Sequence, residues 1–572
     1  MNKLRPVVCR PAPPRAALEN LGGIDPLHAR LFAMRGLTSA DDLDYSLARL
    51  APVSALENID AAAALVIAKR DARITVIGDF DVDGATSTAL VLRCLRDFGF
   101  RDVGYLVPNR FEYGYGLTPE IVDVAAQRSP ALLITVDNGI SSVQGVARAK
   151  ELGIPVLITD HHLPGRELPA AAVILNPNLE GSRFPSRNLA GVGVAFYLMA
   201  RIGRLLEEAG QGGAAKVPAR YLDLVALGTV ADVVPLDHNN RVLVQQGLLR
   251  MRGNQAVAGI EALLKISGRT LSRCVSADLG FAVGPRINAA GRLEDISIGI
   301  ECLLTDNAAT ADEYARILNR INGERRDIEA TMREQAFRFV DRLSEQRWPD
   351  CVCVYDSSWH QGVVGLIAAR VKERCHRPAI AFAREDTRYL KGSARSVQGV
   401  HIRDLLEAIA TAEPGLIEKF GGHAMAAGLT IAESDLDDFK RIAAEQMQRL
   451  YPGADFSGAI VTDGALPQSA LSLSFARSLR EAGPWGSAFP EPMWSGDFDV
   501  VEQRTVGENH LKLRVRSAEG GQVIDAIAFG QAGPVYRGVV QLAYTLDVNE
   551  FRGIENPQLI VEQIAPLQGR SA

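Results

Sequence analysis

Short apolar runs alternate with amphipathic segments between residues 74 and 175. The runs are rich in β-branched side chains, which is typical of buried strands, and the segments between them have helical spacing. Uninterrupted apolar strands separated by helices predict an α/β fold with a parallel sheet covered on both faces. The predicted strands are Ile74–Asp81, Asp102–Pro108, Ala131–Asp137, Ile154–Thr159 and Ala172–Leu175, and the predicted helices are Ala85–Phe98, Pro119–Gln127 and Ser141–Leu152, the last capped by Ser141.

A long helical pattern follows this unit. Apolar residues recur at helical spacing through Ala308–Gln346, between two α/β regions, which favours a connecting helix over a coiled-coil partner surface. A second, smaller α/β unit occupies residues 350–450, with a strand at Cys351–Asp356 and a helix at Leu366–Arg374. The N-terminal 60 residues are predicted to be mostly helical, around Asp25–Met34 and Ser39–Leu50.

Beyond Gly458 the pattern changes to short strands separated by turn residues, which predicts a small β-barrel. In the strand His510–Arg516, alternation places Lys512, Arg514 and Arg516 on one face and apolar residues on the other. This basic face fits either a solvated strand or a nucleic-acid contact surface of an OB-like barrel. The predicted strands are Asp497–Arg504, His510–Arg516, Gln522–Phe529, Val539–Val548 and Gln558–Gln563.

Composition narrows the class of protein. The 572 residues are 47% hydrophobic and 23% charged, as in ordinary globular chains, and no apolar run reaches the length needed to span a bilayer. The N-terminus has no apolar signal-peptide segment, and the seven cysteines form no CxxC pair, so we expect a cytoplasmic protein without a membrane partner. A net charge of −6 excludes a uniformly basic surface but leaves room for a local basic groove.

The first predicted strand ends in three carboxylates at alternate positions, Asp79, Asp81 and Asp83. Carboxylates this close repel one another unless they face water or share a cation. The pattern resembles the start of an EF-hand loop, but that loop ends in a bidentate glutamate, and Leu90 stands at that position here. A strand also precedes the motif, so an EF-hand is excluded; a metal site and a solvated turn at a helix N-terminus remain.

Two more predicted strands end in polar residues. One runs into Asp137, another into Asp160-His161-His162, and Asp232 closes a further apolar stretch. In open α/β sheets, ligand sites form at the carboxyl ends of the strands, so these side chains are expected to meet the three aspartates there. Mixed Asp and His ligation without a thiolate favours Mn²⁺ or Mg²⁺ over structural zinc. We therefore predict a metal site at this sheet edge.

The second α/β unit carries three glycine-rich segments, Trp359–Gly365, Gly392–Ser396 and Gly421–Gly428. A glycine-flanked helix N-terminus binds anions readily, and an arginine such as Arg395 can grip a phosphate with two hydrogen bonds. Together the three segments predict a phosphate-facing surface.

These motifs together resemble the DHH phosphoesterase superfamily, and the agreement is closer with its RecJ family of single-strand-specific exonucleases. The segments GDFDVDG, TVDNG, TDHH, LGTVADVVPL, GPRINAAGR, HQGVVG, GSARS and GGHAMAAG occur in that family's order over most of the chain. The resemblance implies a DHH domain and a DHHA1 domain joined by the long helix, with an OB-fold after them. The implied domains are 1–60 (a helical segment packed on the core), 61–306 (DHH), 307–346 (connecting helix), 347–452 (DHHA1) and 453–572 (OB-fold).

The resemblance also implies roles for individual residues. The implied catalytic residues are Asp83, Asp137 and His162. Asp137 would bridge two Mn²⁺ or Mg²⁺ ions, and His162 would lie beside the scissile phosphate. The implied metal ligands are Asp79, Asp81, Asp83, Asp137, His161 and Asp232, with Asp79 open between a direct and a supporting role. The implied substrate-binding residues are Arg110, Arg286, Asn288, Arg292, Ser393, Arg395 and His423, among which Arg110, Ser393 and Arg395 hold the terminal phosphate. Tyr113 and Tyr115, in the loop after Arg110, are candidates to stack on bases, and ordinary packing that anchors the loop is the alternative.

The implied activity is removal of mononucleotides from the 5′ end of single-stranded DNA during DNA repair and recombination. A single-strand-binding protein and a helicase are the implied partners. Two alternatives remain from the sequence: a DHH phosphoesterase acting on short oligonucleotides, and a non-catalytic single-strand-binding relative.

Overall fold

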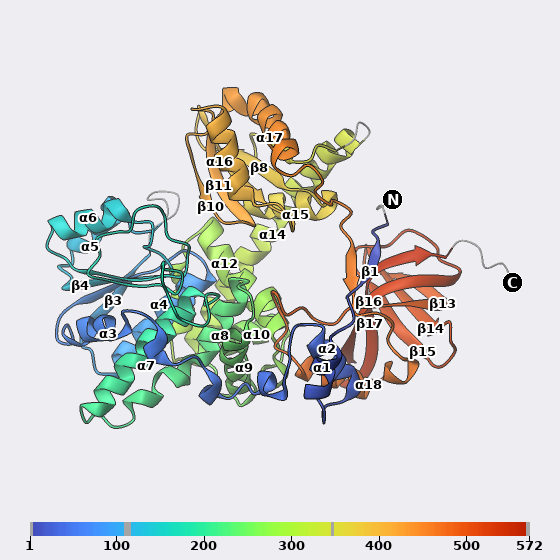
Figure 1. The fold of residues 1–572 in the computed structure, drawn as a ribbon, viewed down its shortest axis with the longest axis horizontal. Coiled ribbons are helices and arrows are strands. Elements are labelled where there is room, and N and C mark those ends of the chain that lie inside the picture. The colour runs from blue at the N-terminus through green and yellow to red at the C-terminus, as the bar shows by residue number, and fades with distance from the viewer. Residues whose placement is uncertain (1–3, 108–115, 345–347, 568–572) are drawn as a thin grey trace. The chain divides into compact units, whose positions relative to one another are not determined.

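A computed structural model describes residues 4–107, 116–344 and 348–567 (Figure 1). The chain divides into two compact units, which we describe one at a time. The first comprises Met1–Asn288, Ile296–Ala315 and Ala459–Ala572, and the second comprises Ala289–Asp295 and Arg316–Gly458. This division is coarser than the five predicted domains, whose boundaries stay a prediction.

The predicted parallel sheet is confirmed in the first unit. Five strands pair in the order β3-β2-β4-β5-β6, all parallel. Within this sheet, β2 comes first in sequence and lies between β3 and β4. The next strand, β3, is added on one side of β2, and β4 to β6 are added on the other side. The direction of strand addition therefore reverses between β2 and β4. Such a reversal opens a crevice at the carboxyl ends of the two strands. The strands are β2 (Ile74–Ile77), β3 (Val103–Leu106), β4 (Leu132–Val136), β5 (Val156–Thr159) and β6 (Val173–Leu175).

Helices cover this sheet and extend it into an α-helical region. Helix α4 follows β2, and its residues from Val82 to Leu95 are all buried because α7 and α8 also pack on it. The helices are α4 (Val82–Asp97), α5 (Pro119–Ala126), α6 (Val143–Glu151), α7 (Gly191–Glu208), α8 (Leu222–Ala231), α9 (His238–Arg252), α10 (Ala258–Ile266), α11 (Ser276–Asp278), α12 (Gly284–Leu293) and α13 (Ser297–Leu304).

The predicted cap of α6 is wrong. Ser142, not Ser141, occupies the N-cap position, and its side chain makes no capping hydrogen bond. The Ser142 hydroxyl instead accepts a hydrogen bond from the backbone N–H of Leu117 at 3.1 Å. The hydroxyl of the N-cap residue therefore binds Leu117 in a neighbouring segment and does not cap α6.

The N-terminal segment is less helical than predicted. Strand β1 (Val7–Cys9) pairs in parallel with β12 (Ile460–Thr462), and two helices follow, α1 (Arg15–Asn20) and α2 (Pro26–Ala33). The helix predicted over Ser39–Leu50 is two 3₁₀ turns, η1 (Ala40–Leu43) and η2 (Leu47–Arg49). Asp42 accepts hydrogen bonds from the backbone N–H groups of Thr38 and Ser39, and Asp44 from that of Ser46. The Asp42 bonds cap the start of η1, whereas the Asp44 bond takes an N–H group that a continuing α-helix would use.

The C-terminal barrel is confirmed and closed, with strand order β13-β14-β15-β17-β16. On β14, Leu511, Leu513 and Val515 are buried inside the barrel. Lys512 and Arg514 point outward, and each reaches a carboxylate: Lys512 lies 2.9 Å from Asp525, and Arg514 lies 3.5 Å from Glu502. The strands are β13 (Trp494–Val506), β14 (His510–Ser517), β15 (Val523–Ala528), β16 (Gly538–Phe551) and β17 (Ile554–Pro566); helix α18 (Leu473–Glu481) packs on β16 and β17.

The second unit holds a mixed sheet in the order β10-β11-β9-β8-β7, in which only β7 and β8 pair in parallel. The predicted long helix is confirmed as α14 (Ala308–Ser344), which lies between the two α/β regions in sequence. The remaining elements are β7 (Val352–Tyr355), α15 (Val364–Cys375), β8 (Ala379–Arg384), β9 (Tyr389–Arg395), α16 (Ile402–Ala412), β10 (Lys419–Gly422), β11 (Ala426–Ala432) and α17 (Leu436–Leu450).

Across the described residues, no single helix has the length and apolar character to cross a membrane. One bent pair, Leu47–Ala55 with Ile59–Ile67, meets the length and composition criteria together, at an angle of 84°. All seven cysteines are free.

Candidate active site

The ends of β2 and β4 and the end of helix α8 bring four of the predicted carboxylates together. Asp81 is the N-cap of α4, where its carboxylate accepts a hydrogen bond from the backbone N–H of Gly84 at 3.0 Å, and Asp83 lies in the first turn of that helix. Asp137 directly follows β4, and Asp232 is the C-cap of α8. Asp232 is thus supplied by the end of a helix, whereas Asp81, Asp83 and Asp137 follow the ends of strands.

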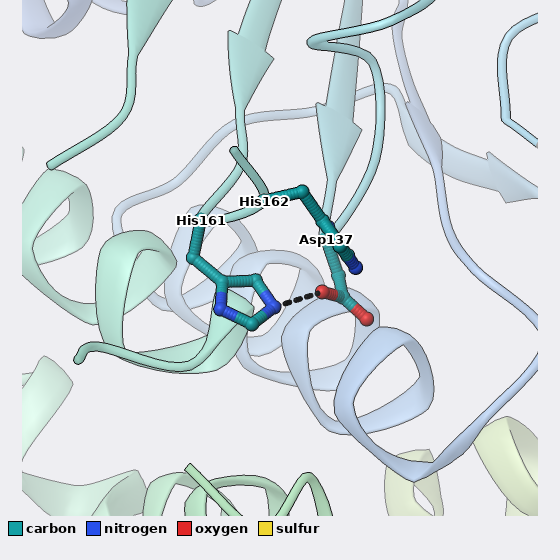
Figure 2. Close-up of side chains that lie close together, drawn as sticks. All are labelled: Asp137, His161 and His162. Carbon is teal, nitrogen blue, oxygen red and sulfur yellow. Dashed lines mark ion pairs between the residues drawn. The ribbon is translucent and has the colours of Figure 1, made fainter. Parts of the chain in front are cut away.

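His161 lies among these carboxylates. Its Nε2 atom is 3.2 Å from an oxygen of Asp137, 3.5 Å from one of Asp232 and 3.9 Å from one of Asp83. Figure 2 shows His161 and Asp137 directed toward each other, with His162 beside them. One imidazole therefore touches carboxylates from three separate segments of the chain.

The donor atoms fall into three groups, each with its atoms within 4.8 Å of one another. The groups are Asp79, Asp81 and Asp137; Asp83, His161 and Asp232; and Asp137, His161 and His162. Every residue predicted to bind metal appears in at least one group. Asp79, whose role the sequence left open, stands with Asp81 and Asp137.

Burial makes this cluster of carboxylates hard to ionise. Burial, followed by repulsion from Asp81, raises the pKa of Asp83 to about 7. The pKa values of Asp79, Asp137 and Asp232 are also raised well above the usual range, again by burial first and by neighbouring aspartates second. Several buried carboxylates at one point can all be ionised only if positive charge lies among them.

This donor set fits a divalent metal of the Mn²⁺ or Mg²⁺ class. Carboxylate oxygens dominate it, one or two imidazoles complete it, and no thiolate is present among the described residues that compose it. Hard divalent cations prefer such oxygen-rich sites, and imidazole nitrogen is accepted by manganese.

The N-terminus of α7 holds the site in place. The backbone N–H groups of Gly191 and Val192 donate to the two oxygens of Asp83, at 2.6 and 2.9 Å. A side chain at Gly191 would not fit, because its Cβ would lie 2.6 Å from the Cβ of Asp137. Asp137 itself has a left-handed backbone with φ of 62°, a conformation that non-glycine residues seldom adopt outside functional sites. Sequence reasoning missed Gly191.

Asp160 orients the two histidines. One of its oxygens accepts hydrogen bonds from the backbone N–H groups of His161 and His162 and lies 2.7 Å from Nδ1 of His162, while the other accepts from the N–H of Ile140 at 2.9 Å. Burial lowers the pKa of His162, but the hydrogen bond and charge of Asp160 outweigh it and bring that pKa to about 9. The carboxylate of Asp160 therefore both orients the His162 ring and favours its protonated form.

Two asparagines after β6 complete this support and were not predicted. Asn176 donates its amide N–H to the carbonyl of His162 at 2.8 Å, and Asn178 donates to the carbonyl of His161 at 2.6 Å. The signal that could have found them was in the sequence, because Asn176-Pro177-Asn178 directly follows the last apolar strand.

In the second unit, Ser393 and Arg395 lie at the N-terminus of α15. A Cβ at Gly365 would be 3.0 Å from a guanidinium nitrogen of Arg395 and 3.1 Å from the Ser393 hydroxyl oxygen. The guanidinium also donates to that hydroxyl at 3.1 Å, and burial lowers the pKa of Arg395. His423 is exposed in the hairpin between β10 and β11, and its backbone N–H donates to the carbonyl of Ala426 at 2.8 Å. A helix N-terminus, a hydroxyl and an arginine together suit a phosphate.

The remaining predicted substrate residues are placed on or near α12. Asn288 accepts a hydrogen bond from the backbone N–H of Val82 at 3.2 Å, which ties α12 to the start of α4. Arg286 donates to the carbonyl of Ala282 at 2.6 Å, and Arg292 to that of Gly362 at 3.1 Å. The predicted residues Arg110, Tyr113 and Tyr115 lie outside the described residues.

Comparison with known proteins identifies related families for three regions of the chain. The DHH family, N-terminal domain, matches residues 73–229, the DHHA1 domain matches residues 349–449, and the RecJ OB domain matches residues 462–563.

Whole-chain relatives are similar over nearly the full length. The chain is 49% identical over 556 residues to the single-stranded-DNA-specific exonuclease RecJ of Salmonella typhimurium, covering 95% of this chain and 96% of that protein. It is 48% identical, with the same coverage of both chains, to the RecJ exonuclease of Escherichia coli.

Solved structures show the same architecture. A crystal structure of RecJ from Thermus thermophilus in complex with Mn²⁺ matches with a TM-score of 0.81 and 29% identity, covering 99% of this chain and 80% of that one. A complex of RecJ from the same organism with Mg²⁺ matches with a TM-score of 0.75 and 27% identity, covering 99% of this chain and 79% of that one.

Proposed function

Because this chain belongs to the family of RecJ single-stranded-DNA-specific exonucleases, we propose that it hydrolyses single-stranded DNA from the 5′ end and releases 5′-mononucleotides. One observation carries the proposal: buried carboxylates converge on His161, with its Nε2 atom 3.2 Å from Asp137, at the point where the strand order of the sheet reverses. A phosphodiester bond is a natural substrate for an oxygen-rich metal site of this kind.

The metal would be Mn²⁺ or Mg²⁺, and two ions would be bound. In support of this number, the groups Asp79–Asp81–Asp137 and Asp83–His161–Asp232 share no residue. Asp137 joins the first group and also lies 3.2 Å from His161, so it is the residue suited to bridge the two. When bound, the metal supplies Lewis-acid polarisation of the phosphate and lowers the pKa of the attacking water.

The chain's own groups orient the substrate and manage the proton. His162, oriented by Asp160, can donate a hydrogen bond to a phosphate oxygen or a proton to the departing 3′ oxygen. Asp83, fixed by the N-terminus of α7, keeps one wall of the site rigid. Precise placement of such groups accounts for a large part of enzymatic rate enhancement.

Attack from the 5′ end requires that a terminal phosphate be recognised. Ser393 and Arg395 at the N-terminus of α15 have the chemistry for this, and we assign the same role to Arg110. Arg286 and Arg292 would contact the substrate backbone, and Tyr113 and Tyr115 would stack on bases. His423 would lie at the edge of the phosphate surface.

The activity needs exposed single-stranded ends. We therefore include a strand-separating helicase and a single-strand-binding protein as partners, and DNA repair and recombination as the setting. A cytoplasmic location agrees with free cysteines throughout the chain.

An Asp137→Ala variant tests the proposed centre. Hydrolysis of a 5′-phosphorylated single-stranded oligonucleotide with Mn²⁺ should fall by at least about a thousandfold, because a bridging ligand is lost. Binding of the oligonucleotide, followed by fluorescence anisotropy, should change by less than about threefold. Asp123→Ala, at an exposed carboxylate of α5 that pairs with Arg148, is the control and should keep full activity. Persistent hydrolysis by Asp137→Ala would show that the assignment is wrong.

A further inference from the structure

Phe281 is the most exposed large apolar side chain among the residues that the structure describes, with 85% of its surface accessible. It lies in a π-helical turn, η7 (Leu279–Val283), that leads directly into α12. All other residues from Leu279 to Ala290 are buried or half-buried. π-Helical turns occur mostly as insertions at functional sites, so an aromatic ring displayed by one calls for an explanation.

The turn that carries Phe281 is packed against the helix end that carries Asp232. A Cβ at Gly280 would lie 3.3 Å from the side chain of Val230, and a Cβ at Gly284 would lie 3.3 Å from that of Ala231. Val230 and Ala231 immediately precede Asp232 in α8. The turn that displays Phe281 is therefore packed on the last turn of α8, the helix that ends at Asp232.

A second exposed apolar side chain adjoins Asp232. Val233 follows it directly, is 67% exposed and has a left-handed backbone with φ of 63°. This conformation is strained for a β-branched residue, and such strain persists mainly where function requires it. Phe281 and Val233 are thus exposed apolar side chains on two segments that pack together at the Asp232 end of α8.

A cation accompanies the aromatic ring. Arg286 donates from Nη1 to the carbonyl of Ala282 at 2.6 Å, which ties the guanidinium to the residue that follows Phe281. An aromatic ring beside an arginine is the combination that binds single-stranded nucleic acid, because the ring stacks on a base and the arginine attracts the backbone. Bases in a duplex are already stacked and cannot use such a ring.

We propose that Phe281 is a positioning residue on whose ring a base of single-stranded DNA stacks beside the metal centre, with Val233 as its apolar neighbour. The inference rests on the proposed function, since it names how that function's substrate is held. It adds to single-strand specificity, because only an unpaired base can leave its own stack to reach the ring.

Steady-state kinetics with Phe281→Leu is the first measurement. The leucine keeps an apolar side chain but loses the stacking surface, so KM for single-stranded DNA should rise about 5- to 150-fold. Phe281→Trp should keep KM within about twofold of the wild type, since its ring also stacks. An equal loss in Phe281→Leu and Phe281→Trp, or no loss in either, would overturn the proposal.

A double-mutant cycle that combines Phe281→Leu with abasic DNA substrates identifies the stacked base. Oligonucleotides carry one abasic residue, moved stepwise from the 5′ end. At one position the abasic substrate should raise KM for the wild type but produce no further rise with Phe281→Leu, because the two changes remove the same contact. Phe551→Leu, which alters another exposed phenylalanine at a barrel hairpin, should couple to no position. Additive effects at every position would contradict the inference.

The proposed function and the stacking role of Phe281 can be refuted separately. Wild-type protein that releases no nucleotide from any single-stranded substrate would refute the proposed function itself. Wild-type protein that digests DNA normally, while Phe281→Leu shows no coupling to any abasic position, would refute only the stacking role.

Discussion

At the scale of single residues, the centre depends on groups that hold the ligands as much as on the ligands. Asp160 accepts hydrogen bonds from two backbone N–H groups and lies 2.7 Å from the ring of His162. In the motif Asp160-His161-His162, the two histidines therefore face the site, and Asp160 orients them. Partners of this kind orient the groups that act on the substrate.

Replacing Asp160 by asparagine tests this division. Asp160→Asn removes the carboxylate that orients His162 and favours its protonated form, so kcat should fall about 10- to 100-fold while KM for single-stranded DNA stays within about twofold. Asp455→Asn is a matched control, because Asp455 also accepts a backbone hydrogen bond, from Ser457, in an exposed turn. An unchanged kcat, or an equal loss of DNA affinity, would show that Asp160 does not position His162.

Sequence reasoning found the charged residues of the site but not those that hold them. Asp79, Asp81, Asp83, Asp137 and Asp232 could be predicted to converge because ends of parallel strands and charge crowding are both visible in a sequence. Gly191 carries no such signal, and Asn176 and Asn178 are marked only by their place directly after the last apolar strand. Their roles depend on which backbone atoms lie opposite them, and that is set by tertiary packing.

At the scale of elements, helix α7 begins directly against the carboxylate cluster proposed to bind metal. Two N–H groups at its N-terminus bind Asp83, where the positive end of the helix dipole also favours a carboxylate. Residue 191 must be glycine because a Cβ there would lie 2.7 Å from a carboxylate oxygen of Asp137. One helix start therefore fixes two ligands.

Gly191→Ala should displace Asp137 and with it the site. We expect kcat/KM to fall at least about a hundredfold, since a shift of about an ångström in a catalytic group has that effect. Mn²⁺ affinity, measured by isothermal titration calorimetry, should weaken in parallel. Gly193→Ala on the same helix is the control, because the three atoms nearest to its Cβ would all belong to the side chain of Leu189 and none to Asp137. Equal behaviour of the two variants would refute the role of α7.

Periodicity predicted most elements but not all of their ends. The strands of the parallel sheet, the long helix α14 and the barrel strands follow directly from apolar spacing, which burial imposes on them. The 3₁₀ turns at Ala40–Leu43 and Leu47–Arg49 do not, because the side chain of Asp44 binds the backbone N–H of Ser46, which a continuous helix would need. Element type follows from burial, whereas element ends follow from individual hydrogen bonds.

At the scale of the whole molecule, the N-terminal segment is tied to the C-terminal barrel region by a buried ion pair. Asp463 is 1% exposed and lies 2.9 Å from Arg35, whose side chain is fully buried, and 3.2 Å from Arg10. The pairing of β1 with β12 continues this connection. Residues that are far apart in sequence therefore form one cooperative junction, which the sequence did not reveal.

Asp463→Ala should destabilise this junction by about 3–5 kcal/mol, because it leaves a buried guanidinium without its partner. Hydrogen exchange at Val7–Cys9 should accelerate correspondingly, and urea unfolding should begin earlier. Asp102→Ala removes an exposed pair with Arg73 and should cost less than about 1 kcal/mol. Unchanged exchange at β1 in Asp463→Ala would contradict the account of how the two ends are joined.

Digestion of end-labelled DNA tests the central claim most directly. Single-stranded and duplex oligonucleotides of the same sequence, labelled at either the 5′ or the 3′ end, are incubated with the wild-type protein and Mn²⁺. The 5′ label on single-stranded DNA should appear as a mononucleotide from the first time point, while the 3′ label moves through successively shorter products and the duplex stays intact. Early release of the 3′ label as a mononucleotide, or equal digestion of the duplex, would contradict a 5′-directed, single-strand-specific exonuclease.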